Sequence, residues 1–455
     1  MKARLVPLYF GSDDDPDFVE HLRLLREFLA DHAELLAPVL LGATVPEADA
    51  VVFPQLVGDA YHRVDELRAL KLPILMLTSD FATMAMWDWE IISYLKSEGV
   101  PVVAPYSLAG AVTACRALAA KRQLREGKFV VYQDHPGEAG AQPQIFRRFY
   151  WWEDECSDRI RERFGLRIVK KSFQELGKKA MDVSDGEAQH DWDRFKSDVP
   201  IAGVGPRGVL SAVKLYRAVR DDLDGEGDVL AAGINCLNES SFSDTTPCLA
   251  WDLLYTERDL IWGCEADTVS MLTKFILHRS LRAPIMMTNL YPFLMGQAAL
   301  QHERIPSFPD VDDPEDHVLA AHCGYLGVLP RPMATEWTLR RKVLAIVDEN
   351  ATAIDARLPV GALTLAKLSP TFDTLFVAEG ELTGYAGYPG SDCQNGALVR
   401  VPDGHALMRA LPSHHSLMVA GHHRAELEAV GQVFGLELER LIANGNKELR
   451  SLRPT

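Results

Sequence analysis

The sequence predicts an α/β protein with two consecutive Rossmann-like parallel-sheet domains, followed by a mostly antiparallel, barrel-like β domain at the C-terminus. Up to residue 300, short apolar runs alternate with helical patterns, as they do in βαβ units. Beyond it, short apolar segments are separated by glycine and proline, which is typical of antiparallel sheets. A chain of 455 residues is also too long for one hydrophobic core.

The first domain, residues 1–145, alternates strands and helices from its start. We expect strands at residues 3–10, 50–53, 73–77 and 101–104, and helices at 17–36, 61–70 and 87–98. The first helix is indicated by apolar residues at helical spacing, including Phe18, Leu22 and Leu25. A loop rich in glycine and proline at 134–143 marks the boundary to the next domain.

The second domain, residues 146–300, repeats the α/β alternation, and the third, residues 301–455, does not. In the second we expect helices at 154–164, 208–223 and 268–278, and strands at 166–169, 229–236, 260–264 and 284–287. In the third we expect strands at 363–368, 374–378 and 396–401, closed by one helix at 424–434. The third domain should therefore form the antiparallel module.

Composition and charge exclude several classes of function. The net charge of −17 argues against a nucleic-acid surface, because phosphate binding needs clustered Lys and Arg. We find no signal-peptide pattern and no apolar run long enough to span a bilayer. The seven cysteines are scattered and include no CxxC pair, which indicates reduced thiols. We therefore expect a cytoplasmic protein that binds neither nucleic acid nor membrane.

Two carboxylates follow apolar runs in the second domain and are candidates for metal binding and acid/base chemistry. Glu239 follows the predicted strand at 229–236, and Asp267 follows the strand at 260–264. Ligands of open α/β sheets bind at this edge, and hard cations prefer oxygen ligands. Either residue alone could simply cap a helix or lie in a solvated loop; Asp267 precedes a predicted helix. Glu265 is two residues from Asp267 and would point to the same side in a continuing strand.

Histidines near the C-terminus could complete a metal site. They occur as two pairs, His414-His415 and His422-His423. One imidazole beside two carboxylates would fix a divalent cation. A competing zinc site would use His322 and Cys323 with His414 or His415, but it lacks the paired spacing of zinc motifs. We therefore expect the oxygen-rich site, with His322 and Cys323 lining the cavity without binding the ion.

A glycine-rich segment at 203–208 matches the GxGxxG pattern of dinucleotide-binding proteins. It contains a proline, follows only a short apolar lead, and precedes no acidic residue on a strand. We interpret it as a glycine turn at the start of a helix.

Several segments together resemble the L-fucose isomerase and L-arabinose isomerase superfamily, most closely the fucose isomerase branch and its shorter relatives. They are Asn235-Cys-Leu-Asn-Glu239, Pro247-Cys-Leu-Ala, Gly263-Cys-Glu-Ala-Asp267, Ala321-His-Cys-Gly324 and Ser413-His-His-Ser with Gly421-His422. The likeness in order and spacing covers residues 229 to 455. Two features differ: the chain is shorter than typical L-fucose isomerases, and Met287-Thr-Asn289-Leu-Tyr291 replaces a Phe-Ala-Asp-Val-Arg run.

The resemblance implies a manganese ion held by Glu239, Asp267 and His415, with the two carboxylates as catalytic base and acid in either order. It further implies a homotrimer or homohexamer in which a neighbour's N-terminal domain closes each site. Trp87 would suit such a wall, although core packing is the commoner role of an aromatic at a helix start. Asn289 and His322 are the other candidate substrate residues.

The implied function is a Mn²⁺-dependent aldose–ketose isomerase that acts on a pentose or deoxyhexose through an enediol intermediate. Two alternatives stay open. The same site could catalyse another metal-dependent reaction on a sugar or sugar acid, such as epimerisation or aldol-type cleavage, because a fold does not fix the reaction. The protein could also bind sugars without catalysis, although a simple binder needs no metal triad.

Overall fold

The computed structural model describes residues 1–53, 60–135, 147, 153–301 and 303–441. The described chain forms two compact units, each assembled from separate segments. The first unit comprises Met1–Gln123, Arg279–Arg282 and His423–Leu438, and the second comprises Leu124–His278, Ala283–His422 and Glu439–Thr455.

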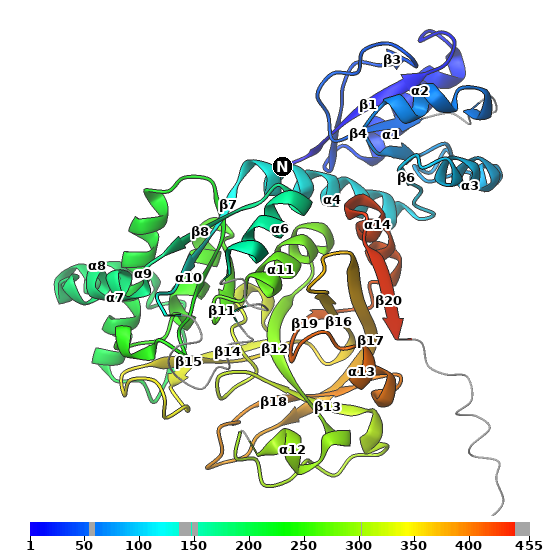
Figure 1. Ribbon diagram of the computed structural model, residues 1–455. Helices are drawn as coiled ribbons and strands as arrows, with labels where there is room; N and C mark the ends of the chain where they lie inside the picture. The colour runs from blue at the N-terminus through cyan, green and yellow to red at the C-terminus, as the bar shows by residue number, and fades with distance from the viewer. Residues whose placement is uncertain (54–59, 136–146, 148–152, 302, 442–455) are drawn as a thin grey trace, which may run out of the picture. The chain divides into compact units, whose positions relative to one another are not determined.

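The first unit contains a parallel sheet with the strand order β2-β1-β4-β5-β6, and β3 pairs with β1. Figure 1 labels β1, β3, β4 and β6 of this sheet. The strands are β1 (Ala3–Tyr9), β2 (Ala33–Leu35), β3 (Val39–Leu40), β4 (Ala50–Phe53), β5 (Ile74–Met76) and β6 (Val102–Val103). The helices are α1 (Pro16–Phe28), α2 (Val64–Ala69), α3 (Trp89–Ser97) and most of α4 (Leu108–Glu126). The predicted parallel α/β sheet is confirmed, because all of its strand pairs are parallel. Its apolar runs are buried, as is usual for parallel strands.

Two predictions for this unit were wrong in detail. The helix predicted to reach residue 36 ends at Phe28, and Ala33–Leu35 forms the short strand β2. The predicted C-terminal helix exists as α14 (Arg424–Phe434), but it belongs to the first unit, whereas we expected it in the domain of the β module. There the Gln432 side chain accepts a hydrogen bond from the backbone N–H of Ala104 at 3.0 Å. An amphipathic pattern shows that a helix has an apolar face but not which surface covers it.

The second unit contains a four-stranded parallel sheet with the order β11-β10-β7-β8. Its strands are β7 (Lys128–Tyr132), β8 (Arg167–Lys171), β10 (Val229–Ile234) and β11 (Ile261–Cys264). Its helices are α6 (Asp154–Phe164), α7 (Phe173–Asp182), α8 (Asp185–Phe195), α9 (Pro206–Asp224), α10 (Cys248–Arg258) and α11 (Thr268–Leu281). The prediction of a second parallel α/β sheet is confirmed.

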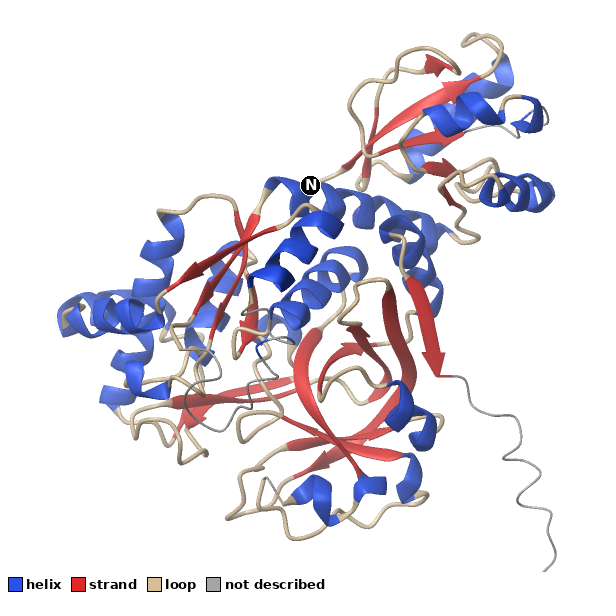
Figure 2. Cartoon of the chain, viewed as in Figure 1, coloured by secondary structure: helices blue, strands red, loops and turns tan. Residues whose placement is uncertain are grey.

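The same unit contains a closed, antiparallel, six-stranded barrel, visible as curved strands in Figure 2. Its strands are β12 (Ile285–Pro292), β13 (His317–Ala321), β16 (Gly361–Leu368), β17 (Thr374–Ala386), β18 (Gly396–Arg400) and β19 (His415–Ala420). Pairing of β16 with β17 closes the ring. The predicted antiparallel, barrel-like module is therefore confirmed, and β20 (Glu437–Leu441) follows α14.

The segment at 284–287 was wrongly assigned to a parallel sheet. It begins β12, which pairs antiparallel with β13 and β19. A fully buried apolar run looks the same in a parallel sheet and in a barrel, so the sequence did not distinguish them. Two predicted domain boundaries separate strands that pair with each other. The boundary at 145 lies between β7 and its partner β10, and the boundary at 300 lies between β12 and its partner β13. Most of the loop at 134–143 is outside the described residues.

A small fourth sheet has the order β15-β14-β9, with β9 (Ile201–Ala202), β14 (Glu336–Arg341) and β15 (Thr352–Arg357). The glycine-rich segment at 203–208 directly follows β9, and α9 starts inside it at Pro206. Gly203 has a φ of +70°, which confirms a glycine turn at a helix start. All seven cysteines are free. Among the described residues, no helix combines the length and apolar character needed to cross a membrane.

Candidate metal centre

The loops that leave the carboxyl edge of the second parallel sheet supply the acidic residues. Ile234 of β10 is in register with Cys264 of β11, so the segments that follow them leave the sheet together. Glu239 lies in the first segment, and Glu265 and Asp267 lie in the second. Glu265 has a φ of 54°, a left-handed backbone that turns the chain sharply from β11 into α11. This turn places the carboxylates of Glu265 and Asp267 at the sheet edge.

The two barrel strands that flank β12 supply the imidazoles. Asn289 of β12 is in register with Ala321 of β13 on one side and with His415 of β19 on the other. His322 follows Ala321 directly, at the end of β13. The barrel ladder therefore holds His322 and His415 at one end, two strands apart.

Glu265, His322 and His415 converge in a buried cluster that could hold a divalent metal ion. The Oε1 atom of Glu265 lies 3.7 Å from Nε2 of His322 and 3.8 Å from Nε2 of His415. The three ligand atoms all lie within 4.8 Å of one another. Metal–ligand bonds of about 2.0–2.2 Å separate neighbouring ligand atoms by roughly 3–3.6 Å, so a small contraction would complete the site.

Asp267 orients His415 within this cluster. Its Oδ2 atom lies 2.8 Å from Nδ1 of His415, and both side chains are fully buried. A hydrogen bond donated by Nδ1 fixes the tautomer in which Nε2 keeps its lone pair for the cluster. Asp267 also accepts hydrogen bonds from the backbone N–H and the hydroxyl of Ser270, at 2.9 and 2.7 Å. Lys367 of β16 lies 3.3 Å from Oδ2. A carboxylate behind a histidine is the usual outer partner of a metal ligand.

The His322 ring also contacts its neighbour in the chain, Cys323. Its Nδ1 atom lies 2.8 Å from Sγ of Cys323. Its Nε2 atom is buried and forms no hydrogen bond within the described part of the chain. A buried polar atom without a hydrogen bond is costly, and a bound cation would satisfy it. We expected His322 to line the cavity without binding an ion, whereas the structure places its nitrogen among the candidate ligands.

Both imidazoles are neutral at physiological pH. Burial lowers the pKa of His322 to about 4, with a further contribution from the neighbouring imidazole of His414. Burial also lowers the pKa of His415 well below its usual value, against the opposing effect of Asp267. Burial alone would raise the pKa of Asp267, but Lys367 and His415 lower it overall. The cluster thus presents two neutral nitrogen donors and a carboxylate, which is the protonation state that metal binding requires.

The soft zinc site considered from the sequence is not assembled. Cys323 is not among the ligand atoms that converge in the described chain. Its thiol lines a narrow, mainly apolar cavity together with Cys236, Cys248 and Cys264. Burial raises the pKa of the Cys323 thiol well above its usual value, so it stays protonated and is a poor ligand.

The other carboxylate predicted as a ligand has different partners. Glu239 is buried, and its carboxylate accepts hydrogen bonds from the backbone N–H groups of Asp134, at 2.9 Å, and His135. Burial raises its pKa, which these bonds partly oppose. Of the predicted triad, the structure therefore joins Asp267 directly to His415 and does not group Glu239 with them.

The two remaining candidate substrate residues lie in different units. Asn289 donates a hydrogen bond to the hydroxyl of Tyr291 at 3.2 Å, and its own Oδ1 atom is buried without a partner among the described residues. Trp87 belongs to the first unit and is 71% exposed. Core packing, the commoner role for this residue type, is therefore wrong for Trp87.

Two residues of the site were not selected from the sequence. Glu265 stands in the same short motif as Asp267, but the sequence predicted only that the two side chains point to the same side and did not predict Glu265 as a ligand. Lys367 stands inside an otherwise apolar strand, β16, and is 2% exposed. A lysine in a buried run is the signal that could have revealed it, because such a charge needs a partner.

Comparisons with protein-family models and with curated proteins found no match to this chain. The chemistry of the centre is therefore assessed from its own donor atoms. Two imidazoles and one carboxylate suit divalent ions such as Mn²⁺, Fe²⁺, Co²⁺ and Zn²⁺, and three protein ligands leave positions open for substrate. This arrangement is typical of catalytic rather than structural metal sites.

Proposed function

We propose that the protein is a metal-dependent aldose–ketose isomerase that acts on a pentose or deoxyhexose, with Mn²⁺ as its cation. The observation that carries the proposal is the buried Glu265–His322–His415 cluster at the junction of a parallel sheet edge and a barrel. The motif resemblance to L-fucose isomerases supplies the reaction class. The cation would polarise the substrate oxygens and stabilise charge on the enediolate, an effect of several kcal/mol in such reactions.

The residues of the cluster would divide the work of holding the cation. Glu265 would contribute the negative charge, and His322 and His415 would contribute neutral nitrogens that fix its position. Asp267 would act behind His415 by holding Nδ1, which keeps Nε2 directed at the site. Because the cluster is buried, bulk water would be excluded and electrostatic stabilisation would be strong.

Proton transfer needs a group whose pKa is near the working pH. Glu239 fits this requirement better than Asp267. Burial raises the pKa of Glu239, whereas Lys367 and His415 keep Asp267 ionised. Glu239 also follows the strand next to β11, so both carboxylate-bearing segments leave the same sheet edge. We therefore assign Glu239 as the acid/base group and Asp267 as the residue that positions His415.

The test is a panel of aldoses and ketoses incubated with purified protein that carries Mn²⁺. We expect interconversion of one aldose–ketose pair, loss of turnover in EDTA and recovery with Mn²⁺. In deuterated water, deuterium should enter the carbon next to the carbonyl, because a carboxyl proton exchanges with solvent. Glu239→Gln should abolish turnover and leave bound Mn²⁺ in place.

Three other results would each replace this proposal. Inverted stereochemistry without a ketose product would indicate an epimerase. Cleavage products would indicate an aldol-type lyase. Tight sugar binding that is independent of metal, with no turnover, would indicate a binding protein. The proposed homotrimer or homohexamer is tested separately by light scattering at micromolar concentration, where a monomer would remove any role of Trp87 in a neighbour's site.

A further inference from the structure

Lys367 is a buried cation directly behind the candidate metal centre. Its side chain is 3% exposed and lies in β16, a strand of the barrel. The ammonium group lies 3.3 Å from Oδ2 of Asp267 and donates a hydrogen bond to the hydroxyl of Ser270. A buried lysine is stable only when such partners offset the loss of hydration.

Asp267 and His415 could in principle hold a cation on the opposite side of the imidazole ring. Oδ2 and Nδ1 are 2.8 Å apart, a separation close to the roughly 3 Å between adjacent ligands of one ion. Two arrangements therefore compete for His415. In one, Nδ1 donates to Asp267 and Nε2 binds the ion; in the other, Asp267 and Nδ1 bind the ion together.

We propose that Lys367 is a positioning residue that acts as a built-in counter-cation, which reserves Asp267 for His415 and confines the divalent ion to the Glu265–His322–His415 side. Its positive charge balances the carboxylate and repels a second cation from Oδ2. The charge of Asp267 is then balanced by Lys367, and its remaining role is to accept the hydrogen bond that Nδ1 of His415 donates. The inference rests on the metal centre of the proposed function, and not on the sugar reaction.

The test is a double-mutant cycle on metal affinity with Lys367→Gln and His322→Gln. Mn²⁺ binding is measured by electron paramagnetic resonance of free Mn²⁺, and site geometry by the visible spectrum of bound Co²⁺. In the wild-type background, His322→Gln should weaken Mn²⁺ binding by more than about a hundredfold, because the ion depends on that nitrogen. In the Lys367→Gln background the same change should cost less than about tenfold, because Asp267 is released to bind the ion.

Lys367→Arg is the matched control, since it keeps the charge at nearly the same place. It should retain the wild-type dependence on His322 and the wild-type Co²⁺ spectrum. Lys367→Met, which is neutral and of similar length, replaces Lys367→Gln if that variant does not fold. An equal cost of His322→Gln in the charged and neutral backgrounds overturns the inference.

The outcomes for the inference and for the proposed function are separable. A wild-type protein that binds Mn²⁺ and shows the predicted cycle, yet turns over no sugar, supports the role of Lys367 and refutes the isomerase. A protein that isomerises a sugar but shows no coupling between positions 367 and 322 supports the isomerase and refutes the role of Lys367. A wild-type protein that binds no divalent ion refutes both.

Discussion

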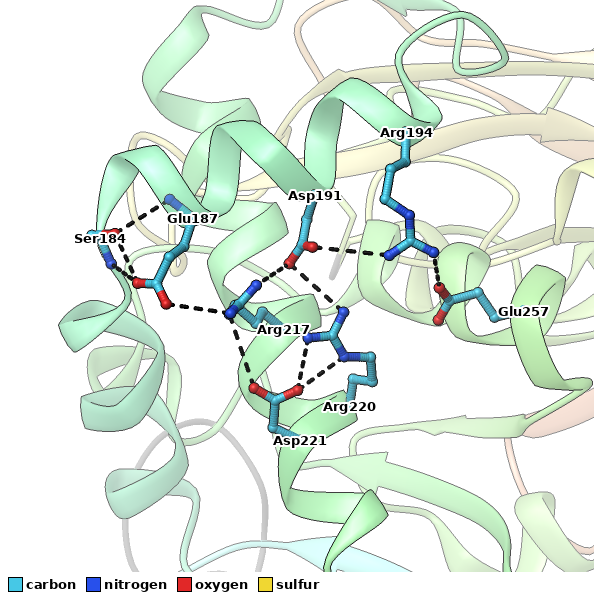
Figure 3. A network of polar contacts seen from close by, with 8 residues as sticks. All are labelled: Ser184, Glu187, Asp191, Arg194, Arg217, Arg220, Asp221 and Glu257. Atoms are coloured by element: carbon cyan, nitrogen blue, oxygen red, sulfur yellow. Dashed lines mark hydrogen bonds and ion pairs between the residues drawn. The ribbon is translucent and has the colours of Figure 1, made fainter.

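The polar network around Asp191 and the Glu265–His322–His415 cluster are both built on buried carboxylates of the second unit, but their charges are balanced differently. In the Asp191 network, arginines of the chain itself surround the carboxylate: Arg217 at 2.9 Å, Arg220 at 3.7 Å and Arg194 at 3.9 Å (Figure 3). In the cluster, the carboxylate faces two imidazoles that are neutral because burial lowers their pKa.

The Asp191 network also extends outward until its charges are nearly matched. Arg217 contacts Glu187, Arg220 contacts Asp221, and Arg194 contacts Glu257. Ser184 and Glu187 form a capping box at the start of α8, so the network also fixes a helix end. Its geometry is complete without any added ion. The difference teaches that burial of a carboxylate alone does not mark a functional site; the nature of its partners does.

The largest effect should follow from removal of an imidazole from the cluster. His415→Gln and His322→Gln should each lower Mn²⁺ affinity by more than about a hundredfold, because the remaining donors cannot replace a ligand nitrogen. Isothermal titration calorimetry measures the change. His405→Gln is the matched control, because His405 is 62% exposed and should leave the affinity unchanged. Full affinity in both cluster variants would remove the metal centre.

The Asp191 network should respond in stability and not in metal binding. Asp191→Ala removes the carboxylate that three guanidinium groups share and should lower the free energy of unfolding by about 1–3 kcal/mol, because each arginine keeps a second acidic partner. Urea denaturation measures the loss, and added Mn²⁺ should bind with wild-type affinity. Asp193→Ala is the control, because that carboxylate is 48% exposed and its removal should leave the free energy of unfolding essentially unchanged. A loss of metal affinity in Asp191→Ala would break the contrast between the two regions.

The two acidic residues predicted as ligands sharpen the comparison further. Asp267→Asn should lower Mn²⁺ affinity by about 10–100-fold, as is usual when the outer partner of a ligand histidine is changed. Glu239→Gln should leave the affinity within about threefold, because Glu239 is held by backbone N–H groups and is not grouped with the cluster. If Glu239→Gln instead abolishes binding, the triad predicted from the sequence is the metal site.

The sequence predicted the alternating half of the fold well because local patterns decide it. Buried strands such as β4 and β11, and helices such as α6, follow directly from apolar runs and spacing. Partners are harder to predict, because they depend on the whole chain. β12 has a pattern that fits two kinds of sheet, and α14 has an apolar face that fits two units. The long helix α4 was not predicted, because its many alanines make its two faces nearly equal in hydrophobicity and so give no clear helical pattern.

The candidate site was predicted in outline and not in its ligand set. His415 and Asp267 were selected because they belong to short motifs, and the structure brings them together at 2.8 Å. Glu265 was not selected, because its side-chain direction depends on a left-handed turn that the sequence does not announce. Lys367 was not selected, because its partner Asp267 is 100 residues away in the chain. Sequence distance hides this pair, and only the closed barrel joins it.

We expect the smallest effect from the substitution of Asp222, a second buried carboxylate whose charge is balanced by basic side chains of the chain itself. Its side chain is 7% exposed and lies 2.6 Å from Lys171 and 2.8 Å from Lys179, and it accepts a hydrogen bond from Tyr132 at 2.9 Å. Burial alone would raise the pKa of Asp222, but these partners lower it overall. Asp222→Asn should therefore lower the free energy of unfolding at pH 7 by about 1–2 kcal/mol.

The pH dependence of that loss provides the decisive measurement. A carboxyl group whose pKa is lower in the folded protein stabilises it fully above the unfolded pKa of about 3.9, and this contribution disappears as the pH falls through the folded value. The difference in unfolding free energy between wild type and Asp222→Asn should thus be constant from pH 7 to about 5 and shrink below about 4. Mn²⁺ should not alter this curve, because the lysines already supply the balancing charge. A difference that persists unchanged at pH 3 would mean that Asp222 acts through packing and not through its charge.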